Sequence, residues 1–260
     1  MSYQELAGRT AVVTGAAGGM GREIARQLAH VGATVAMVDR DDTALVKTAV
    51  TFDVLGLKVV PFSADVSSSS EVDATVEAIE RSIGPIDYLV NAAGVLRLGR
   101  AEDLSDDDWA AMFGVNTHGV FHVSRAVVRR MAPRGRGALV TVTSNAATTA
   151  RAEMSAYAAS KAAATAFTKC LGLEVAGSGI RCNVVAPGST DTPMLNGMRT
   201  HGAVEASIEG TPEAYRVGIP LRKVALPADI ANAVVFLLSD RASHITMQHL
   251  TIDGGATLGA

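Results

Sequence analysis

Short, almost continuous apolar runs recur along this chain and alternate with longer amphipathic stretches. Runs of this kind predict strands that are buried on both faces, because a strand with one wet face would alternate apolar and polar residues. The pattern therefore predicts a parallel sheet covered by helices. The expected strands are Thr10–Thr14, Thr34–Asp39, Lys58–Ala64, Tyr88–Asn91, Ala138–Thr143, Ile180–Ala186 and Leu250–Asp253.

Helical patterns fill the gaps between these runs. The expected helices are Met20–Val31, Thr43–Leu55, Glu71–Ile83, Asp106–Met131, Met154–Ala176 and Ala228–Leu238. Seven strands alternating with helices are typical of an α/β, doubly wound (Rossmann-type) sheet with helices on both faces. No linker divides the 260 residues, so we expect a single domain over 1–260. Pro187–Pro227 is the longest irregular part, and we expect a substrate lid at about 190–223.

Composition excludes several classes of function. The net charge of −3 gives no electrostatic footprint for nucleic acid or an anionic membrane. No apolar run approaches the ~18 residues of a membrane span, and the N-terminus lacks a signal-peptide pattern, so we expect a cytoplasmic protein. Neither the histidines nor Cys170 and Cys182 show metal-ligand spacing, and we expect no bound metal.

A glycine-rich turn, TGAAGGMG at Thr14–Gly21, follows the first expected strand and opens the first helix. Glycines permit a tight turn and let a pyrophosphate approach the backbone, and the helix N-terminus offers N–H donors. The turn therefore predicts a dinucleotide site. Its expected contacts are Gly15, Gly19, Met20 and Gly21.

The second expected strand ends at Asp39, 18 residues beyond Gly21. A carboxylate at this position accepts a hydrogen bond from a ribose 2′-hydroxyl and repels a 2′-phosphate, which favours NAD over NADP. The neighbouring Arg40 weakens this inference, because a guanidinium can accommodate a phosphate.

Two more strand ends carry candidate cofactor contacts. Asp65 either bonds an adenine edge or caps a turn, and the small residues of Asn91–Gly94 either admit a cofactor or form an ordinary turn. In the functional interpretation the contacts are Asp65, Val66, Asn91, Ala92 and Gly94.

Tyr157 and Lys161 are four residues apart on an expected helix, so they lie one turn apart on the same face. A phenol titrates near pKa ~10, and a nearby ammonium favours the phenolate, which makes a tyrosine usable as an acid or base. Ser144 follows the run ALVTVTS and should lie at the carboxyl edge of the sheet, where open α/β sheets bind ligands. Such a Tyr-Lys pair alone is a weak signal, because it is common on helix surfaces.

These motifs occur in the order of the short-chain dehydrogenase/reductase family, which the chain resembles over essentially its whole length. The shared elements are Thr14–Gly21, Asn91–Gly94, Asn116, Ser144, Tyr157, Lys161, Pro187 and Gly188. The resemblance implies that Tyr157 is the general acid/base and that Lys161 lowers its pKa and binds the nicotinamide ribose. It implies that Ser144 orients the substrate oxygen and that Asn116 supports a water-linked proton path.

The resemblance also implies cofactor contacts from the segment after the sixth strand and assembly into a homotetramer. The contacts of that segment are Pro187, Gly188, Thr190 and Thr192.

Further segments, among them Arg151–Ala163 and Ala242–Ala260, are similar to family members that make a catechol acid for siderophores by oxidising a ring hydroxyl of a dihydroaromatic carboxylate. A cyclic hydroxy acid needs a cationic partner, and a guanidinium can bind its carboxylate bidentately. Arg151 and Arg97 are the candidates, and either one could instead be a solvated loop residue. Beside Met194, Leu195 replaces an expected polar glutamine, which leaves the ring substituents open.

Three alternatives remain at this stage. One is a dehydrogenase for a ring acid that carries an amine in place of one hydroxyl, and kinetics on the two acids would separate them. Another is an NADPH-dependent ketoacyl or steroid reductase, against which Asp39 argues. The last is a catalytically silent cofactor-binding regulator or scaffold, against which the intact set of Asn116, Ser144, Tyr157 and Lys161 argues.

Overall fold

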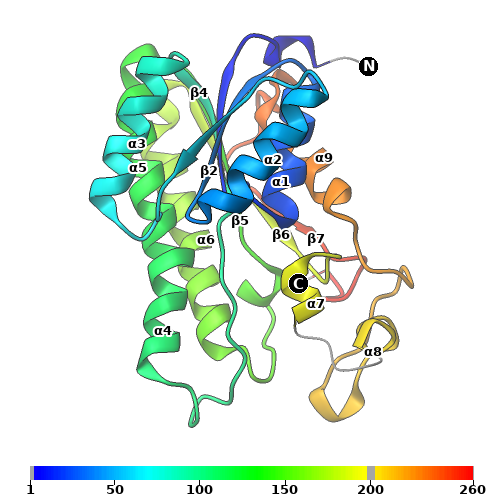
Figure 1. Ribbon diagram of the computed structural model, residues 1–260. Coiled ribbons are helices and arrows are strands. Elements are labelled where there is room, and N and C mark those ends of the chain that lie inside the picture. The colour runs from blue at the N-terminus through cyan, green and yellow to red at the C-terminus, as the bar shows by residue number, and fades with distance from the viewer. Residues whose placement is uncertain (1–2, 198–202, 260) are drawn as a thin grey trace.

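The computed structural model describes residues 3–197 and 203–259, which form the expected doubly wound α/β fold (Figure 1). Seven strands make one sheet in the order β3-β2-β1-β4-β5-β6-β7, and every neighbouring pair is parallel. The strands are β1 (Thr10–Thr14), β2 (Thr34–Asp39), β3 (Val59–Ser63), β4 (Ile86–Asn91), β5 (Gly137–Val142), β6 (Ile180–Pro187) and β7 (His249–Ile252).

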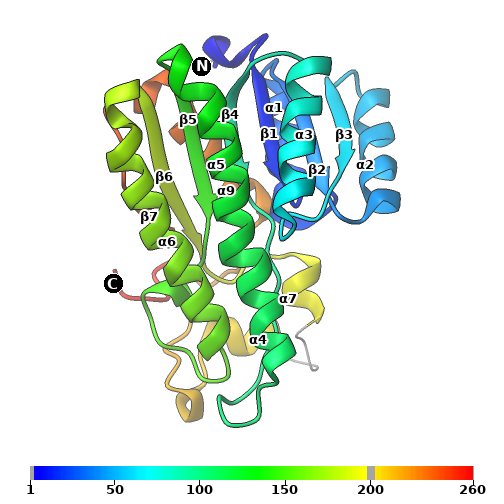
Figure 2. The same cartoon turned by 90° about the vertical axis from the view of Figure 1, so that its left-hand side faces the viewer.

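Helices cover both faces of the sheet (Figure 2). One face carries α1 (Gly19–His30), α2 (Asp42–Val54) and α9 (Pro227–Leu238). The opposite face carries α3 (Ser69–Ser82), α5 (Val120–Met131) and α6 (Ser155–Val175). Short 3-10 segments are η1 (Gln4–Leu6), η3 (Ala132–Arg134), η4 (Asn145–Ala147), η5 (Ala176–Ser178), η6 (Pro212–Ala214) and η7 (Asp240–Ala242).

The central strands explain why the sequence shows continuous apolar runs. Every residue of β1 and β4 is buried, because α1 and α9 pack on one side of them and α3 and α5 on the other. At roughly 25 cal/mol per Å² of apolar surface, burial on both sides supplies the main stabilisation of such a sheet. The core is built mostly from Ala, Val, Leu and Ile side chains.

The strand order reverses between β1 and β4, so a crevice opens there at the carboxyl edge of the sheet. The loops after the strands and two short helices, α7 (Pro193–Gly197) and α8 (Ala203–Glu209), lie below that edge in Figure 1. These helices correct the expectation that Pro187–Pro227 is wholly irregular. Residues 198–202 of the expected lid lie outside the described residues.

The base of the lid is closed by backbone pairing. Thr190 forms a parallel bridge with Ala225, the Asp191 N–H donates to the Ala225 carbonyl at 2.8 Å, and the Ala225 N–H donates to Ser189 at 3.0 Å. The segment expected to form a lid therefore begins and ends at neighbouring points, beside the end of β6.

The expected helix Asp106–Met131 is not continuous. It consists of α4 (Asp106–Phe113), a π-helical turn (Gly114–Gly119) and α5. Such turns inside helices frequently accompany functional sites.

Among residues 3–197 and 203–259, no helix combines the length and the apolar character that crossing a bilayer requires. The same residues contain no group of three or more His, Cys, Asp or Glu side chains placed to hold a metal ion.

Candidate active site

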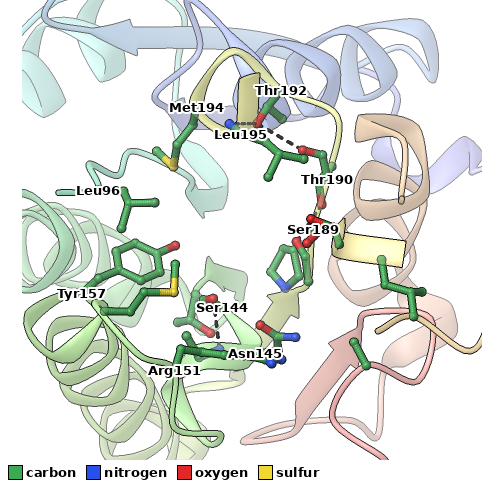
Figure 3. A pocket seen from close by; sticks show the side chains of 18 of the residues that line it. Leu96, Ser144, Asn145, Arg151, Tyr157, Ser189, Thr190, Thr192, Met194 and Leu195 are labelled. Carbon is green, nitrogen blue, oxygen red and sulfur yellow. Dashed lines mark hydrogen bonds between the residues drawn. The ribbon is translucent and has the colours of Figure 1, made fainter. Parts of the chain in front are cut away.

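Two elements bring Ser144 and Tyr157 together. Ser144 follows β5 and caps η4, where its hydroxyl accepts a hydrogen bond from the Ala146 N–H at 3.1 Å. Tyr157 lies in the first turn of α6, and its hydroxyl points into a cavity that Ser144 also lines (Figure 3). Both residues are only 8% exposed, and Ser144 lies close enough to the Tyr157 hydroxyl to affect its pKa. The predicted pair therefore meets at one cavity wall.

The electrostatics of this pair differ from the expectation. Burial raises the pKa of Tyr157, and the neighbouring Ser144 side chain lowers it by less. The Lys161 ammonium lies 5.9 Å from the centroid of the Tyr157 ring and donates to the Val142 carbonyl at 3.1 Å. Burial lowers the pKa of Lys161 to about 8. Desolvation thus outweighs the predicted effect of Lys161 on the pKa of Tyr157, since both side chains lie in the protein interior.

Asn116 lies in the π-helical turn and is fully buried. Its side-chain oxygen accepts from the Val95 N–H at 2.9 Å, and its amide group donates to the Val95 carbonyl at 2.9 Å and to the Ser160 hydroxyl at 3.0 Å. A Cβ on Gly94 would lie 3.2 Å from the Lys161 Nζ and 3.4 Å from the Asn116 oxygen. Asn116 therefore holds the segment after β4 against α6, beside the lysine. Its part in a proton path stays a prediction.

The glycine turn packs directly against the end of β4. Gly15 has φ +69°, and a Cβ there would lie 2.8 Å from the Ala93 backbone. The Thr14 hydroxyl accepts from the N–H groups of Ala92 and Ala93 at 3.1 and 3.2 Å. Thr14, which the sequence did not single out for a role, fastens the two predicted cofactor segments to each other.

Gly21 and Gly19 explain why α1 begins where it does. A Cβ on Gly21 would overlap the Gly15 carbonyl, so the first turn of α1 can approach the loop only without a side chain. Gly19 has φ +54°, and Thr192 of the lid lies next to it. The N-terminus of α1 therefore faces the crevice with little steric cover, as a pyrophosphate site requires.

A second hollow adjoins the turn at the ends of β2, β3 and β4. Its lining consists of Gly15, Asp39, Arg40, Ala64, Asp65, Val66, Ala93, Gly94, Val95 and Val115. The Asp39 carboxylate accepts from the N–H groups of Ala17 and Asp41 at 3.0 and 3.2 Å. Asp65 accepts from the backbone and hydroxyl of Ser67, which lowers its pKa. Together with the bare glycine turn, this hollow fits the adenosine half of a dinucleotide.

The side chain of Asn91 is engaged inside the protein, and a cofactor contact of this residue stays a prediction. Its amide group donates to the Ser124 hydroxyl at 2.9 Å and the Thr141 hydroxyl at 3.5 Å, inside the protein. Its side chain ties β4 to α5 and β5 and does not line either hollow. Its polar partners lie far away in sequence, which is why the motif alone did not reveal them.

The larger cavity, of about 900 Å³ counted to its open mouth, surrounds the Tyr157 hydroxyl (Figure 3). The predicted residues that line it are Met20, Ser144, Arg151, Tyr157, Pro187, Gly188, Thr190, Thr192, Met194 and Leu195. Thr190 and Thr192 are buried, and their hydroxyls donate to carbonyls of their own loop, Gly188 at 3.1 Å and Thr190 at 3.3 Å.

The two candidate arginines differ in whether they line the cavity. Arg151 lines the large cavity, where burial lowers its pKa. Arg97 lies outside that cavity, pairs with Asp108 at 3.4 Å and donates to the Leu96 carbonyl at 3.1 Å. The geometry therefore favours Arg151 as the partner of a substrate anion.

Sequence reasoning missed several residues of the cavity, among them Leu96, Asn145, Met154 and Arg216. The Asn145 amide group donates to Asp253 at 3.2 Å and so joins the loop after β5 to the C-terminal segment. Arg216 comes from the lid, in a stretch without any motif, and only the fold brings it to the site.

The glycine turn leaves the N-terminus of α1 open to a crevice at the carboxyl edge of the sheet, and a buried serine and tyrosine lie beside that crevice. This combination is typical of a nicotinamide-dependent dehydrogenase or reductase. The chain belongs to the short-chain dehydrogenase/reductase family, since residues 15–257 match the family model described as enoyl-(acyl carrier protein) reductase. It is 50% identical over 260 residues to 2,3-dihydro-2,3-dihydroxybenzoate dehydrogenase of Bacillus subtilis, covering all of both chains. The enzyme of the same description from Escherichia coli is 41% identical, with 98% of this chain and all of the relative covered.

Solved structures agree with this assignment. A gluconate 5-dehydrogenase from Burkholderia cenocepacia in complex with NADP and tartrate matches with a TM-score of 0.91 and 30% identity, over 99% of both chains. A 7α-hydroxysteroid dehydrogenase complexed with NADH matches with a TM-score of 0.89 and 32% identity, over 96% of this chain and 95% of the other. A nicotinamide dinucleotide is therefore the expected cofactor class.

Proposed function

We propose that this protein is an NAD-dependent dehydrogenase that oxidises 2,3-dihydro-2,3-dihydroxybenzoate to 2,3-dihydroxybenzoate. The observation that carries the proposal is a single cavity lined by the hydroxyls of Tyr157 and Ser144 and by the guanidinium of Arg151. That set matches a substrate with an oxidisable ring hydroxyl and a carboxylate. Full-length similarity to two enzymes of that description supports the choice of ring acid.

The chain's own residues account for the proton chemistry. Tyr157, as phenolate, takes the proton of the ring hydroxyl, and Ser144 donates a hydrogen bond to the oxygen as it becomes a carbonyl. A bound nicotinamide would supply the hydride acceptor for the ring carbon that carries this hydroxyl. The resulting ring ketone then loses a ring proton and gains one on oxygen, which gives the aromatic catechol. The net change is one two-electron oxidation with release of one proton.

Lys161 and Asn116 act behind the reacting groups. The Lys161 ammonium is held by the Val142 carbonyl within 5.9 Å of the Tyr157 ring centroid, so it can stabilise the phenolate once that anion forms. Asn116 fixes the neighbouring backbone at Val95. Both residues thereby position the acid/base without contacting the substrate.

NAD is the proposed dinucleotide because Asp39 lines the adenosine hollow. Its carboxylate is fixed by two backbone N–H donors, and a free lone pair can accept from a ribose hydroxyl. A 2′-phosphate at the same place would meet a fixed negative charge. The neighbouring Arg40 lines the same hollow but is exposed, so solvent screens its charge.

The proposal is tested by kinetics on two ring acids with NAD, the dihydroxy acid and trans-2,3-dihydro-3-hydroxyanthranilate. We expect a higher kcat/KM for the dihydroxy acid. A higher kcat/KM for the amine-bearing ring acid would identify that acid as the substrate and leave the proposed reaction class unchanged. No oxidation of either acid would contradict the proposal.

We also propose a homotetramer, as the family resemblance implies. Exposed apolar side chains on the helices of one side support an interface there, since Trp109 is 46%, Phe121 39% and Leu173 70% exposed. The C-terminal segment offers a second patch with Leu250 and Leu258. Light scattering should give four chain masses, and a monomer would contradict this assembly.

A further inference from the structure

Arg216 occupies a rigid position in the lid. Its N–H donates to the Thr211 carbonyl at 3.1 Å, and its own carbonyl accepts from the Thr211 N–H at 2.8 Å. Gly210 and Gly218 pack so closely around this turn that a Cβ on either would overlap neighbouring backbone. The turn therefore fixes the Cα of Arg216 and the direction in which its side chain leaves the lid.

That side chain lines the same cavity as Arg151, which comes from the loop between β5 and α6. The two charges are close enough to interact, since Arg216 lowers the pKa of Arg151 in addition to burial. Asp253 opposes this effect, but its carboxylate already accepts hydrogen bonds from Asn145, Gly255 and Thr257. Two guanidinium groups thus face one partly buried space.

Within the described part of the chain, neither Arg151 nor Arg216 has an acidic side chain as a salt-bridge partner. Other arginines nearby do: Arg222 of the same lid pairs with Glu209 at 2.6 Å. Two like charges in a half-buried site repel each other and are poorly solvated unless an anion lies between them. The arrangement therefore calls for an anionic ligand.

We propose that Arg216 is a second carboxylate-binding residue and that the substrate's ring carboxylate is held between Arg216 of the lid and Arg151 of the sheet edge. The inference rests on the proposed function and specifies how that site recognises an acid. A carboxylate has two oxygens and about four acceptor sites, enough for two guanidinium groups. The bound acid then joins the loop of Arg216 to the sheet edge, so the site binds acids in preference to neutral alcohols.

Benzoate is a suitable probe because it carries the ring carboxylate without an oxidisable hydroxyl. Titration calorimetry on the NAD-loaded full chain would measure its Kd for the wild type, Arg216→Gln and Arg222→Gln. We expect Arg216→Gln to weaken binding by about 10- to 100-fold, the range for a lost charge-assisted hydrogen bond. Arg222→Gln is the matched control, since it removes a lid charge that Glu209 already neutralises.

Equal benzoate Kd values for Arg216→Gln and the wild type, or no binding by the wild type, would overturn the inference. Turnover of a neutral methyl ester of the ring acid keeps the test independent of lid folding. We expect Arg216→Gln to oxidise the ester as the wild type does. If Arg216→Gln lost turnover equally on the acid and on the ester, the substitution would have disturbed the structure around the site. That result would also overturn the inference. Oxidation of the ring acid by the wild type tests the proposed function separately, because benzoate binding requires no chemistry.

Discussion

The ammonium of Lys161 lies 5.9 Å from the centroid of the Tyr157 ring, and its hydrogen bond goes to the Val142 carbonyl. One helical turn therefore places the two residues side by side without joining them directly. Burial governs both groups: it raises the pKa of Tyr157 and lowers that of Lys161 to about 8. Burial makes the Tyr157 phenolate costly to form. The Ser144 side chain and the Lys161 ammonium are the groups that can offset this cost.

Replacing Tyr157 by Phe should remove turnover and leave the dinucleotide hollow intact. The hydroxyl is the group proposed to accept the substrate proton, and such a group contributes about 10²- to 10⁴-fold in rate. Steady-state kcat would fall by that range, while the Kd for NADH, measured by fluorescence titration, should stay within about twofold of the wild type, because general acid/base loss leaves cofactor binding unaffected. Near-normal turnover of the variant would refute the acid/base role.

Lys161→Met should change how stability depends on pH. Burial lowers the pKa of Lys161 from 10.5 to about 8, so between these values the unfolded chain binds more protons than the folded chain. Wild-type stability relative to Lys161→Met should therefore rise with pH through this window, by about 2 kcal/mol between about pH 7 and about pH 10. Denaturant unfolding at both pH values measures it.

Lys47→Met is the control for this comparison, because it makes the same substitution at an exposed lysine of α2. A stability difference between the wild type and Lys161→Met that does not change with pH would show that Lys161 keeps an ordinary pKa in the folded protein.

Asp39→Asn should relax the choice of dinucleotide. Asparagine keeps an oxygen for the Ala17 N–H and removes the charge that repels a 2′-phosphate. The ratio of kcat/KM for NADP to that for NAD should rise by about tenfold or more, which corresponds to ~1.4 kcal/mol of repulsion removed. Asp42→Asn, an exposed change in the first turn of α2, should leave the ratio alone. A wild-type preference for NADP would itself disprove the assignment of NAD.

Arg151→Gln and Arg97→Gln form a matched pair for the substrate carboxylate. The first removes a cavity-lining guanidinium and should lower kcat/KM for the ring acid by about 10- to 100-fold. The second removes an exposed charge paired with Asp108, which contributes little. Comparable losses of kcat/KM in both variants, or a larger loss for Arg97→Gln, would contradict the assignment of the carboxylate-binding site to Arg151.

The fold was largely predictable, because a strand that is buried on both faces requires an almost continuous run of apolar residues. The bounds of β1 and β2 match the predicted Thr10–Thr14 and Thr34–Asp39. The π-helical turn was not predictable, since it accompanies long-range hydrogen bonds of Asn116 to Val95 and Ser160 inside a segment with an ordinary helical pattern.

The site divides in the same way. Ser144 and Tyr157 could be placed together because Ser144 follows a strand and Tyr157 lies in the first turn of the next long helix, so both lie at the sheet edge. The core partners of the Asn91 side chain could not be read from its motif, and Arg216 was overlooked because only the fold brings it to the cavity. Local motifs thus predicted two groups that meet at the cavity, and tertiary contacts decide which further residues line it.

The most direct test of the central claim is a product analysis with purified enzyme, NAD and 2,3-dihydro-2,3-dihydroxybenzoate. NADH formation would be followed by absorbance and the ring product identified by mass spectrometry. We predict one NADH for each 2,3-dihydroxybenzoate formed, and formation of both products at least about 100-fold more slowly with Tyr157→Phe. Absence of the catechol acid, or its formation only with NADP, would contradict the account.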